Sequence, residues 1–126
     1  MEKFHLHVLI VDDESLIRWS LSETLAEAGH TVTEAGDGAS VVRMLADRPT
    51  PPDVVLLDYR LPDSNDLGLL ATIRQLAPRT PVILMTAYGT PELTRDALDL
   101  GAYRVVNKPF EVRDLAALIL QAHASR

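Results

Sequence analysis

The stretch Val54-Val55-Leu56-Leu57-Asp58 decides the fold, because four apolar residues of strand length end at a carboxylate and the loop Tyr59-Arg60-Leu61-Pro62 follows at once. Three other apolar runs end in polar residues: 8–11 at Asp12-Asp13, 82–85 at Thr86, and 105–106 at Asn107-Lys108-Pro109. Continuous apolar runs are typical of buried parallel strands, whose carboxyl ends share one edge of the sheet. The sequence therefore predicts an α/β fold that gathers three carboxylates, a hydroxyl and an ammonium around one small pocket.

Apolar runs and helical patterns alternate five times, as expected for successive βαβ units. The expected strands are 8–11, 31–35, 53–57, 82–85 and 103–106, and the expected helices are 14–28, 38–47, 67–76, 91–100 and 112–123. Helix ends are indicated by Gly29, Pro49, Pro78 and Gly101, and Thr90 is expected to cap the fourth helix. Because crossovers are right-handed, the pattern predicts a doubly wound three-layer sandwich, with five helices covering both faces of a five-stranded parallel sheet.

Length and composition limit the classes of protein to consider. The chain of 126 residues fits one domain, expected over residues 1–126 with a core of about 6–123. No apolar run approaches the roughly 20 residues that span a bilayer, and residues 1–5 lack a secretory signal, which favours the cytoplasm. The absence of cysteine excludes disulfides and thiolate sites. A net charge of -6 argues against nucleic-acid binding by this domain alone.

Each motif also has a simpler structural interpretation. Asp12-Asp13 could cap the first helix, Thr86 could be a satisfied strand-end hydroxyl, and Lys108 could be a solvated lysine before a turn. Adjacent carboxylates repel each other, however, and with Asp58 as a third they favour a bound Mg²⁺, which prefers hard oxygen ligands. Together these residues supply what a phosphoryl group on a carboxylate requires: a nucleophile, a metal site, a hydroxyl and a cation.

Four segments carry a resemblance to a known family: Val11-Asp12-Asp13-Glu14, Leu56-Leu57-Asp58-Tyr59-Arg60-Leu61-Pro62, Met85-Thr86-Ala87-Tyr88-Gly89 and Asn107-Lys108-Pro109-Phe110. In order and spacing they resemble the receiver domain of two-component response regulators over nearly the whole chain. Ile17-Arg18-Trp19 adds a less specific similarity to the NtrC-like transcriptional activators. The resemblance implies a CheY-like sheet in the order 2-1-3-4-5 and a domain that regulates an output, transcriptional in the NtrC-like subgroup.

The resemblance also implies a role for each site residue. Asp58 would accept a phosphoryl group from a sensor histidine kinase, and Thr86 and Lys108 would contact the phosphoryl oxygens. Asp13 and Asp58 would bind Mg²⁺ together with the backbone carbonyl of Arg60, whereas Asp12 would act through water. Such a domain assists its own phosphorylation and dephosphorylation but transforms no metabolite, so it is not expected to be an enzyme in the metabolic sense.

Partner surfaces are expected at two places. Leu16 and Trp19 lie opposite the inward face of the first helix, where receivers dock their kinase by resemblance; partial burial at the edge of the core is an equally weighted alternative. The fourth helix, fifth strand and fifth helix could form a homodimer surface. The kinase, the signal, the output module and the oligomeric state stay open.

Two positions depart from the family pattern. Val105 stands where receivers often carry a switching aromatic residue, and strand alternation predicts Tyr103 on the same face; whether Tyr103 or Tyr88 replaces the aromatic residue is open. Asn65-Asp66 occupy a turn where the family commonly has glycine, and both tolerate left-handed backbone.

Three other functions would each require a different pattern. A haloacid-dehalogenase-like phosphatase would carry an aspartate at the position of Arg60, and a flavodoxin-like cofactor binder would carry a glycine-rich loop in place of Asp12-Asp13. A degenerate receiver would act only as a contact surface, which the complete set of site residues argues against. The four histidines show no metal-ligand spacing and are expected to be surface or strand residues.

Overall fold

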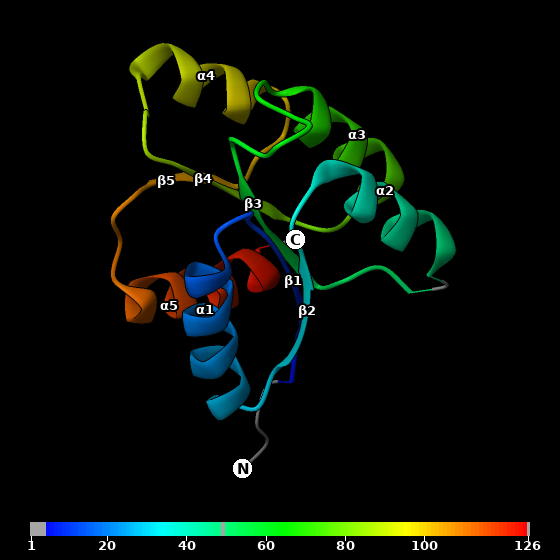
Figure 1. Ribbon diagram of the computed structural model, residues 1–126, viewed down its shortest axis with the longest axis vertical. Helices are drawn as coiled ribbons and strands as arrows, with labels where there is room; N and C mark the ends of the chain where they lie inside the picture. Colours follow the sequence, from blue (N-terminus) through cyan, green and yellow to red (C-terminus); the bar gives the residue numbers. More distant parts are fainter. Residues whose placement is uncertain (1–4, 49, 126) are drawn as a thin grey trace.

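The computed structural model describes residues 5–48 and 50–125, which form a five-stranded parallel sheet with five helices (Figure 1). The strands are β1 (His7–Val11), β2 (Thr31–Ala35), β3 (Val54–Asp58), β4 (Val82–Thr86) and β5 (Arg104–Asn107). The helices are α1 (Ser15–Glu27), α2 (Gly38–Asp47), α3 (Gly68–Leu76), α4 (Pro91–Asp99) and α5 (Val112–Ala124). The strand order β2-β1-β3-β4-β5 confirms the predicted doubly wound topology.

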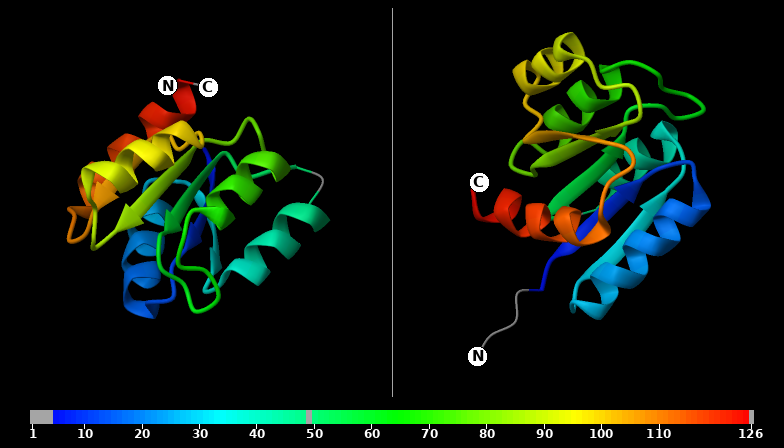
Figure 2. Two further views of the ribbon diagram at one scale, coloured as in Figure 1. Left: turned by 90° about the horizontal axis from the view of Figure 1, so that it is seen from above. Right: turned by 90° about the vertical axis from the view of Figure 1, so that its left-hand side faces the viewer.

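The sheet separates two apolar clusters. Leu9, Val55 and Leu84 point into the cluster that α2, α3 and α4 cover, and their neighbours Ile10, Leu56 and Ile83 point into the cluster that α1 and α5 cover. All residues of β3 and β4 are buried, because helices cover both faces of these strands (Figure 2). This packing fixes the ends of β1, β3 and β4, from which the site is built.

Most predicted element ends are confirmed. Gly29 and Gly101 follow α1 and α4 with φ values of 94° and 102°, a backbone conformation that favours glycine. The Thr90 hydroxyl accepts a hydrogen bond from Leu93 N at 3.1 Å and caps α4 as expected. Ala28 differs from expectation: α1 ends one residue earlier, so Ala28 is exposed instead of continuing the buried stripe.

The predicted shared face of Tyr103 and Val105 is wrong. Val105 packs against the cluster under α2, α3 and α4, whereas Tyr103 packs against the opposite cluster. Tyr103 lies before Arg104, the first residue of β5, so the strand alternation does not extend to it. Tyr103 therefore lies across the sheet from Val105 and does not take the place of the missing aromatic residue.

Two smaller expectations are also corrected. Within the described ranges only glycines have positive φ, so neither Asn65 nor Asp66 uses the left-handed conformation allowed for them. His30 is buried, not a surface residue, and its Nδ1 accepts a hydrogen bond from Leu6 N at 3.1 Å. Burial lowers the pKa of His30, and the nearby His5 acts in the same direction.

Some predictions concern residues outside the described ranges. These are the N-terminal passage through residues 1–4 and the helix-ending role of Pro49; α2 itself ends at Asp47, before an extended Arg48. No helix in the described ranges has both the length and the apolar character needed to cross a membrane. That residues 1–126 make up one domain with a core of about 6–123 stays a prediction.

Candidate functional site

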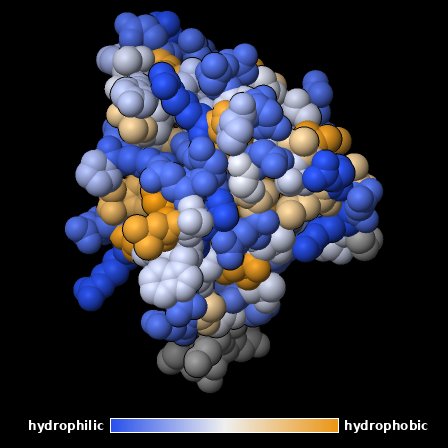
Figure 3. All heavy atoms as spheres, viewed as in Figure 1, coloured by the Kyte–Doolittle hydropathy of each residue, from blue (hydrophilic) through white to orange (hydrophobic). Residues whose placement is uncertain are grey.

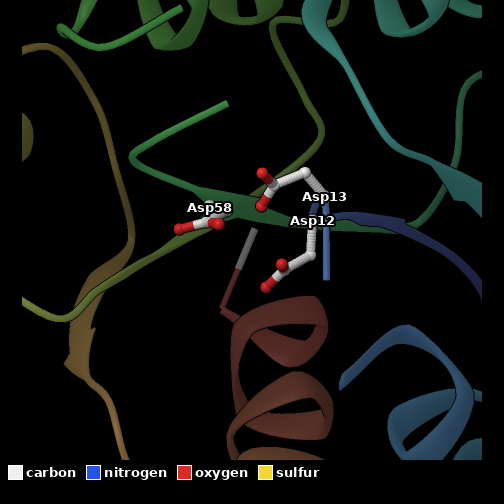
Figure 4. Close-up of side chains that lie close together, drawn as sticks. All are labelled: Asp12, Asp13 and Asp58. Carbon is white, nitrogen blue, oxygen red and sulfur yellow. The ribbon is translucent and has the colours of Figure 1, made fainter. Parts of the chain in front are cut away.

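Three carboxylates meet at the carboxyl edge of the sheet, as the strand ends predict. Asp58 is the last residue of β3, and Asp12 and Asp13 directly follow the neighbouring strand β1 (Figure 4). One oxygen atom from each of the three carboxylates lies within 4.8 Å of the other two. Asp12 and Asp58 are buried, whereas Asp13 is exposed to solvent. The arrangement therefore combines two desolvated carboxylates with a third that remains open to an incoming ion.

Asp12 is fixed through both its backbone and its side chain. Its N–H donates to Ala35 O at 3.0 Å, and its carbonyl accepts a hydrogen bond from the guanidinium of Arg18. Its Oδ1 accepts from Glu14 N at 2.9 Å. Glu14, not Asp12 or Asp13, is the N-cap residue of α1, so the simple capping alternative for this pair is wrong. Arg18 was missed as a site residue because an arginine in a helical pattern gives no sequence signal for a bond to a backbone carbonyl.

Lys108 joins the carboxylates from the end of β5. Its Nζ lies 2.8 Å from Asp12 Oδ2, 3.4 Å from Asp58 Oδ2 and 3.5 Å from Glu14 Oε1. The backbone N–H of Lys108 donates to Thr86 O at 2.8 Å, and the Lys108–Pro109 peptide bond is cis. The alternative of a solvated lysine is therefore wrong, because this ammonium is largely buried and paired with acidic groups.

The burial of these charges shifts their proton affinities. Burial raises the pKa of Asp58 to about 6, and the charge of Asp12 acts in the same direction, while Lys108 and the Arg60 N–H oppose the change. Burial lowers the pKa of Lys108, but its hydrogen bonds and attraction to Asp12 and Asp58 outweigh this effect and raise the pKa above its ordinary value. The site holds a cationic lysine beside a carboxylate that is ionised above pH 6.

Thr86, the last residue of β4, is buried beside this cluster. Its hydroxyl accepts a hydrogen bond from Tyr88 N at 3.0 Å, and the preceding residue, Met85, pairs with Asp58 in the sheet. The structure thus brings Thr86 to the same edge as the carboxylates. The hydroxyl hydrogen is not used in that bond and is available to another acceptor.

Arg60 and Tyr88 form a pair above the strand ends. The guanidinium carbon of Arg60 lies 4.5 Å from the centre of the Tyr88 ring, within the range of a cation–π interaction. Both side chains are exposed, Tyr88 by 63%. The Arg60 N–H is 3.4 Å from Asp58 Oδ1, which is a long contact for a hydrogen bond. Sequence spacing alone does not reveal this pairing, because the two side chains come from different loops.

The outward face of α1 is unpacked. Leu16 and Trp19 are 74% and 61% exposed, so the alternative of partial burial at the core edge is wrong. A hollow of about 410 Å³ lies alongside, and its lining includes Ile17, Ala87 and Phe110. Figure 3 shows apolar surface where α1 and α5 lie in Figure 1.

Comparison with known proteins gives a consistent set of relatives. The family model described as response regulator receiver domain matches residues 8–120. The DNA-binding transcriptional regulator NtrC of Escherichia coli K12 is 42% identical over 115 residues, and the regulatory protein AtoC of the same organism is 40% identical over 115 residues. Each alignment covers 91% of this chain and 24% of the relative, so the chain spans about a quarter of the length of these relatives.

Solved structures show the same likeness. A CheY-like receiver domain protein from Methanospirillum hungatei has a TM-score of 0.89 at 27% identity, covering 97% of this chain and 96% of that one. The beryllofluoride-activated NtrC4 receiver domain dimer has a TM-score of 0.86 at 30% identity, covering 94% and 97%. NtrX from Brucella abortus has a TM-score of 0.86 at 31% identity, covering 97% of this chain and 27% of its own.

Proposed function

This chain belongs to the family of response regulator receiver domains, the signalling modules of two-component systems, and we propose that its switch is phosphorylation of Asp58 by a sensor histidine kinase. The observation that carries the proposal is the group of Asp12, Asp58 and Lys108 at the edge of the sheet, with Nζ 2.8 and 3.4 Å from the two carboxylates. The family assignment favours neither the phosphatase nor the cofactor-binding alternative.

In the proposed reaction, a carboxylate oxygen of Asp58 attacks the phosphorus of a phosphohistidine. The new bond joins oxygen to phosphorus, the bond between phosphorus and the histidine nitrogen breaks, and its electron pair stays on that nitrogen, which takes up a proton. Lys108 and the Thr86 hydroxyl are proposed to stabilise the phosphoryl oxygens, which their location beside Asp58 at the sheet edge supports. Because the pKa of Asp58 is raised only to about 6, the attacking carboxylate is ionised at neutral pH.

The donor set fits Mg²⁺. Three carboxylates offer hard oxygen atoms within 4.8 Å of one another, and at least one carboxylate is open to water, as this strongly hydrated ion requires. By the family resemblance, Asp13, Asp58 and the Arg60 backbone carbonyl would hold the ion directly, and Asp12 would act through water. When bound, the ion offsets the negative charge between the nucleophile and the phosphoryl group.

The proposal is tested by incubating the purified protein with Mg²⁺ and acetyl phosphate and measuring its intact mass. We expect one added phosphoryl group, mapped to Asp58, and none in the Asp58→Asn variant. The amide keeps the shape of the side chain but is not a nucleophile. The variant should therefore stay folded, so that its lack of a phosphoryl group reports the loss of the nucleophile and not unfolding. A phosphoryl group on another residue of the wild type would refute the assignment, and no uptake would leave only the contact-surface alternative.

Two surfaces are proposed for partners. The exposed Leu16 and Trp19, beside the hollow at α1, are proposed to receive the kinase, because they offer apolar area next to the site. The surface of α4, β5 and α5 is proposed for a phosphorylation-dependent homodimer. A structural neighbour is a receiver domain dimer, which supports this choice.

The output is proposed to be transcriptional, because the curated relatives are named as a transcriptional and a regulatory protein, although the chain spans only about a quarter of their length. A net charge of -6 supports the proposal that this domain does not itself bind DNA. A cytoplasmic location, expected from the sequence, stays part of the proposal.

A further inference from the structure

The loop that follows Asp58 is fastened to the first turn of α2. The carboxylate of Asp63 accepts hydrogen bonds from Gly38 N at 2.8 Å and from Ala39 N at 3.0 Å. The same loop is closed by a tight turn, in which Leu61 and Ser64 exchange two backbone hydrogen bonds of 2.7 and 3.2 Å. A segment that begins at the proposed phosphoacceptor is therefore anchored to a second element of the fold.

This contact does more than cap a helix, because α2 already has a cap of its own. The Asp37 side chain accepts a hydrogen bond from Ser40 N at 2.7 Å and occupies the usual N-cap position. Asp63 is 25 residues away from Gly38 in the sequence, and its carboxylate binds two further N–H groups of the same turn. This turn is the N-terminus of α2, where the helix dipole favours a negative charge. The approach is close, since a Cβ atom at Gly38 would lie 3.2 Å from Asp63 Oδ1.

Arg60 lies between the end of β3 and the part of the loop that Asp63 fastens to α2. Its N–H reaches Asp58 only at 3.4 Å, so the phosphoacceptor does not hold it firmly. The next residue, Leu61, is buried in the core, and the Asp63 contact with α2 follows two residues later. The Arg60 carbonyl thus lies between Tyr59, whose N–H donates to Met85 O at 2.8 Å, and the Asp63 anchor on the other side.

We propose that Asp63 is a positioning residue of the phosphorylation site: its carboxylate, bound to the first turn of α2, keeps the Arg60 carbonyl where Mg²⁺ binds. This inference rests on the proposed function. Removing a group that orients a metal ligand typically weakens metal binding about 10- to 100-fold. Asp63 acts on only one metal ligand, and it does so through the main chain. We therefore expect Asp63→Ala to lower the Mg²⁺ affinity about tenfold, near the lower end of this range.

The chain provides a matched control in Asp37→Ala. That variant removes a carboxylate cap from the same turn of α2 but leaves the loop after Asp58 attached. It should lose stability in the same manner as Asp63→Ala while keeping the Mg²⁺ affinity of the wild type. Asp63→Asn retains one acceptor oxygen and should bind Mg²⁺ with intermediate affinity.

The experiment is a Mg²⁺ titration followed by amide NMR shifts, with no phosphodonor present. A second measurement is the hydrogen exchange of the Gly38 and Ala39 amides, which added Mg²⁺ should slow in the wild type and in Asp37→Ala but not in Asp63→Ala. Equal Mg²⁺ affinities in Asp63→Ala and Asp37→Ala would overturn the inference and leave Asp63 as a second helix cap. If Asp63→Ala does not fold, the Mg²⁺ affinity of Asp63→Asn is compared with that of Asp37→Ala instead, and equal affinities would again overturn the inference. Failure of the wild type to bind Mg²⁺ would instead overturn the proposed function, and the inference with it.

Discussion

Replacing Asp58 with asparagine should stabilise the metal-free protein, and the gain should grow with pH. Asp58 is 6% exposed, and burial with the charge of Asp12 raises its pKa from 3.8 to about 6. Between these two values the folded state binds more protons than the unfolded state, so the wild type loses stability as the pH rises. Below pH 3.8 this loss is absent, and above about pH 6 it is complete. Asparagine carries no charge at any of these pH values, so the Asp58→Asn variant does not lose this stability.

The size of the effect follows from the same shift. A change of one pKa unit corresponds to about 1.4 kcal/mol, so the full shift corresponds to about 3 kcal/mol. At pH 4.5 about one third of this loss has developed, so the advantage of Asp58→Asn should increase by about 2 kcal/mol between pH 4.5 and 7.5.

The assay is urea unfolding of both proteins at a series of pH values in the presence of a chelator. Asp37→Asn serves as a control of opposite sign. Hydrogen bonds from Ser40 lower the pKa of Asp37, so this group stabilises the wild type more as the pH rises. Asparagine cannot ionise, so Asp37→Asn should become less stable relative to the wild type as the pH rises. A difference between Asp58→Asn and the wild type that does not vary with pH would refute the reasoning, as would one that shrinks as the pH rises.

Three further outcomes are expected. Asp13→Ala should weaken Mg²⁺ binding more than Asp12→Ala, because Asp13 is proposed to bind the ion directly and Asp12 only through water; equal losses in a calorimetric titration would contradict this ranking. The double variant with alanine at Arg60 and Tyr88 should lose its phosphoryl group faster in a kinase-free sample, because the stacked pair then no longer shields Asp58 from water; an unchanged decay rate would remove shielding as the explanation. Thr86→Val should still be phosphorylated but lose the phosphate-dependent change in amide exchange over α4, β5 and α5, and a response equal to wild type would exclude this route.

The strand ends could be predicted from sequence because each is marked twice, by an apolar run and by the polar residue that stops it. Asp58 and Thr86 are such residues, and parallel packing then brings them to one edge. The local signals for helix ends, such as Gly29 and Gly101, are equally direct, because positive φ favours one residue type.

The supporting contacts could not be predicted in this way. Arg18 binds a backbone carbonyl, and Asp63 binds two backbone N–H groups of α2. Backbone groups are the same in nearly every residue, so the sequence does not reveal these pairings. The face of Tyr103 could not be predicted, because periodicity does not show that β5 begins only at Arg104, and a shift of one residue reverses the face. Long-range contacts to the main chain leave no pattern in a single sequence.

The ion pair between Lys108 and Asp12 joins residues that are 96 positions apart. During synthesis, Asp12 and Asp58 both enter the chain well before Lys108, the lysine that pairs with them. A nascent chain that has reached only β4 therefore holds two carboxylates at the sheet edge without their internal cation, and burying them is costly. Completion of the acidic pocket should thus coincide with the addition of β5.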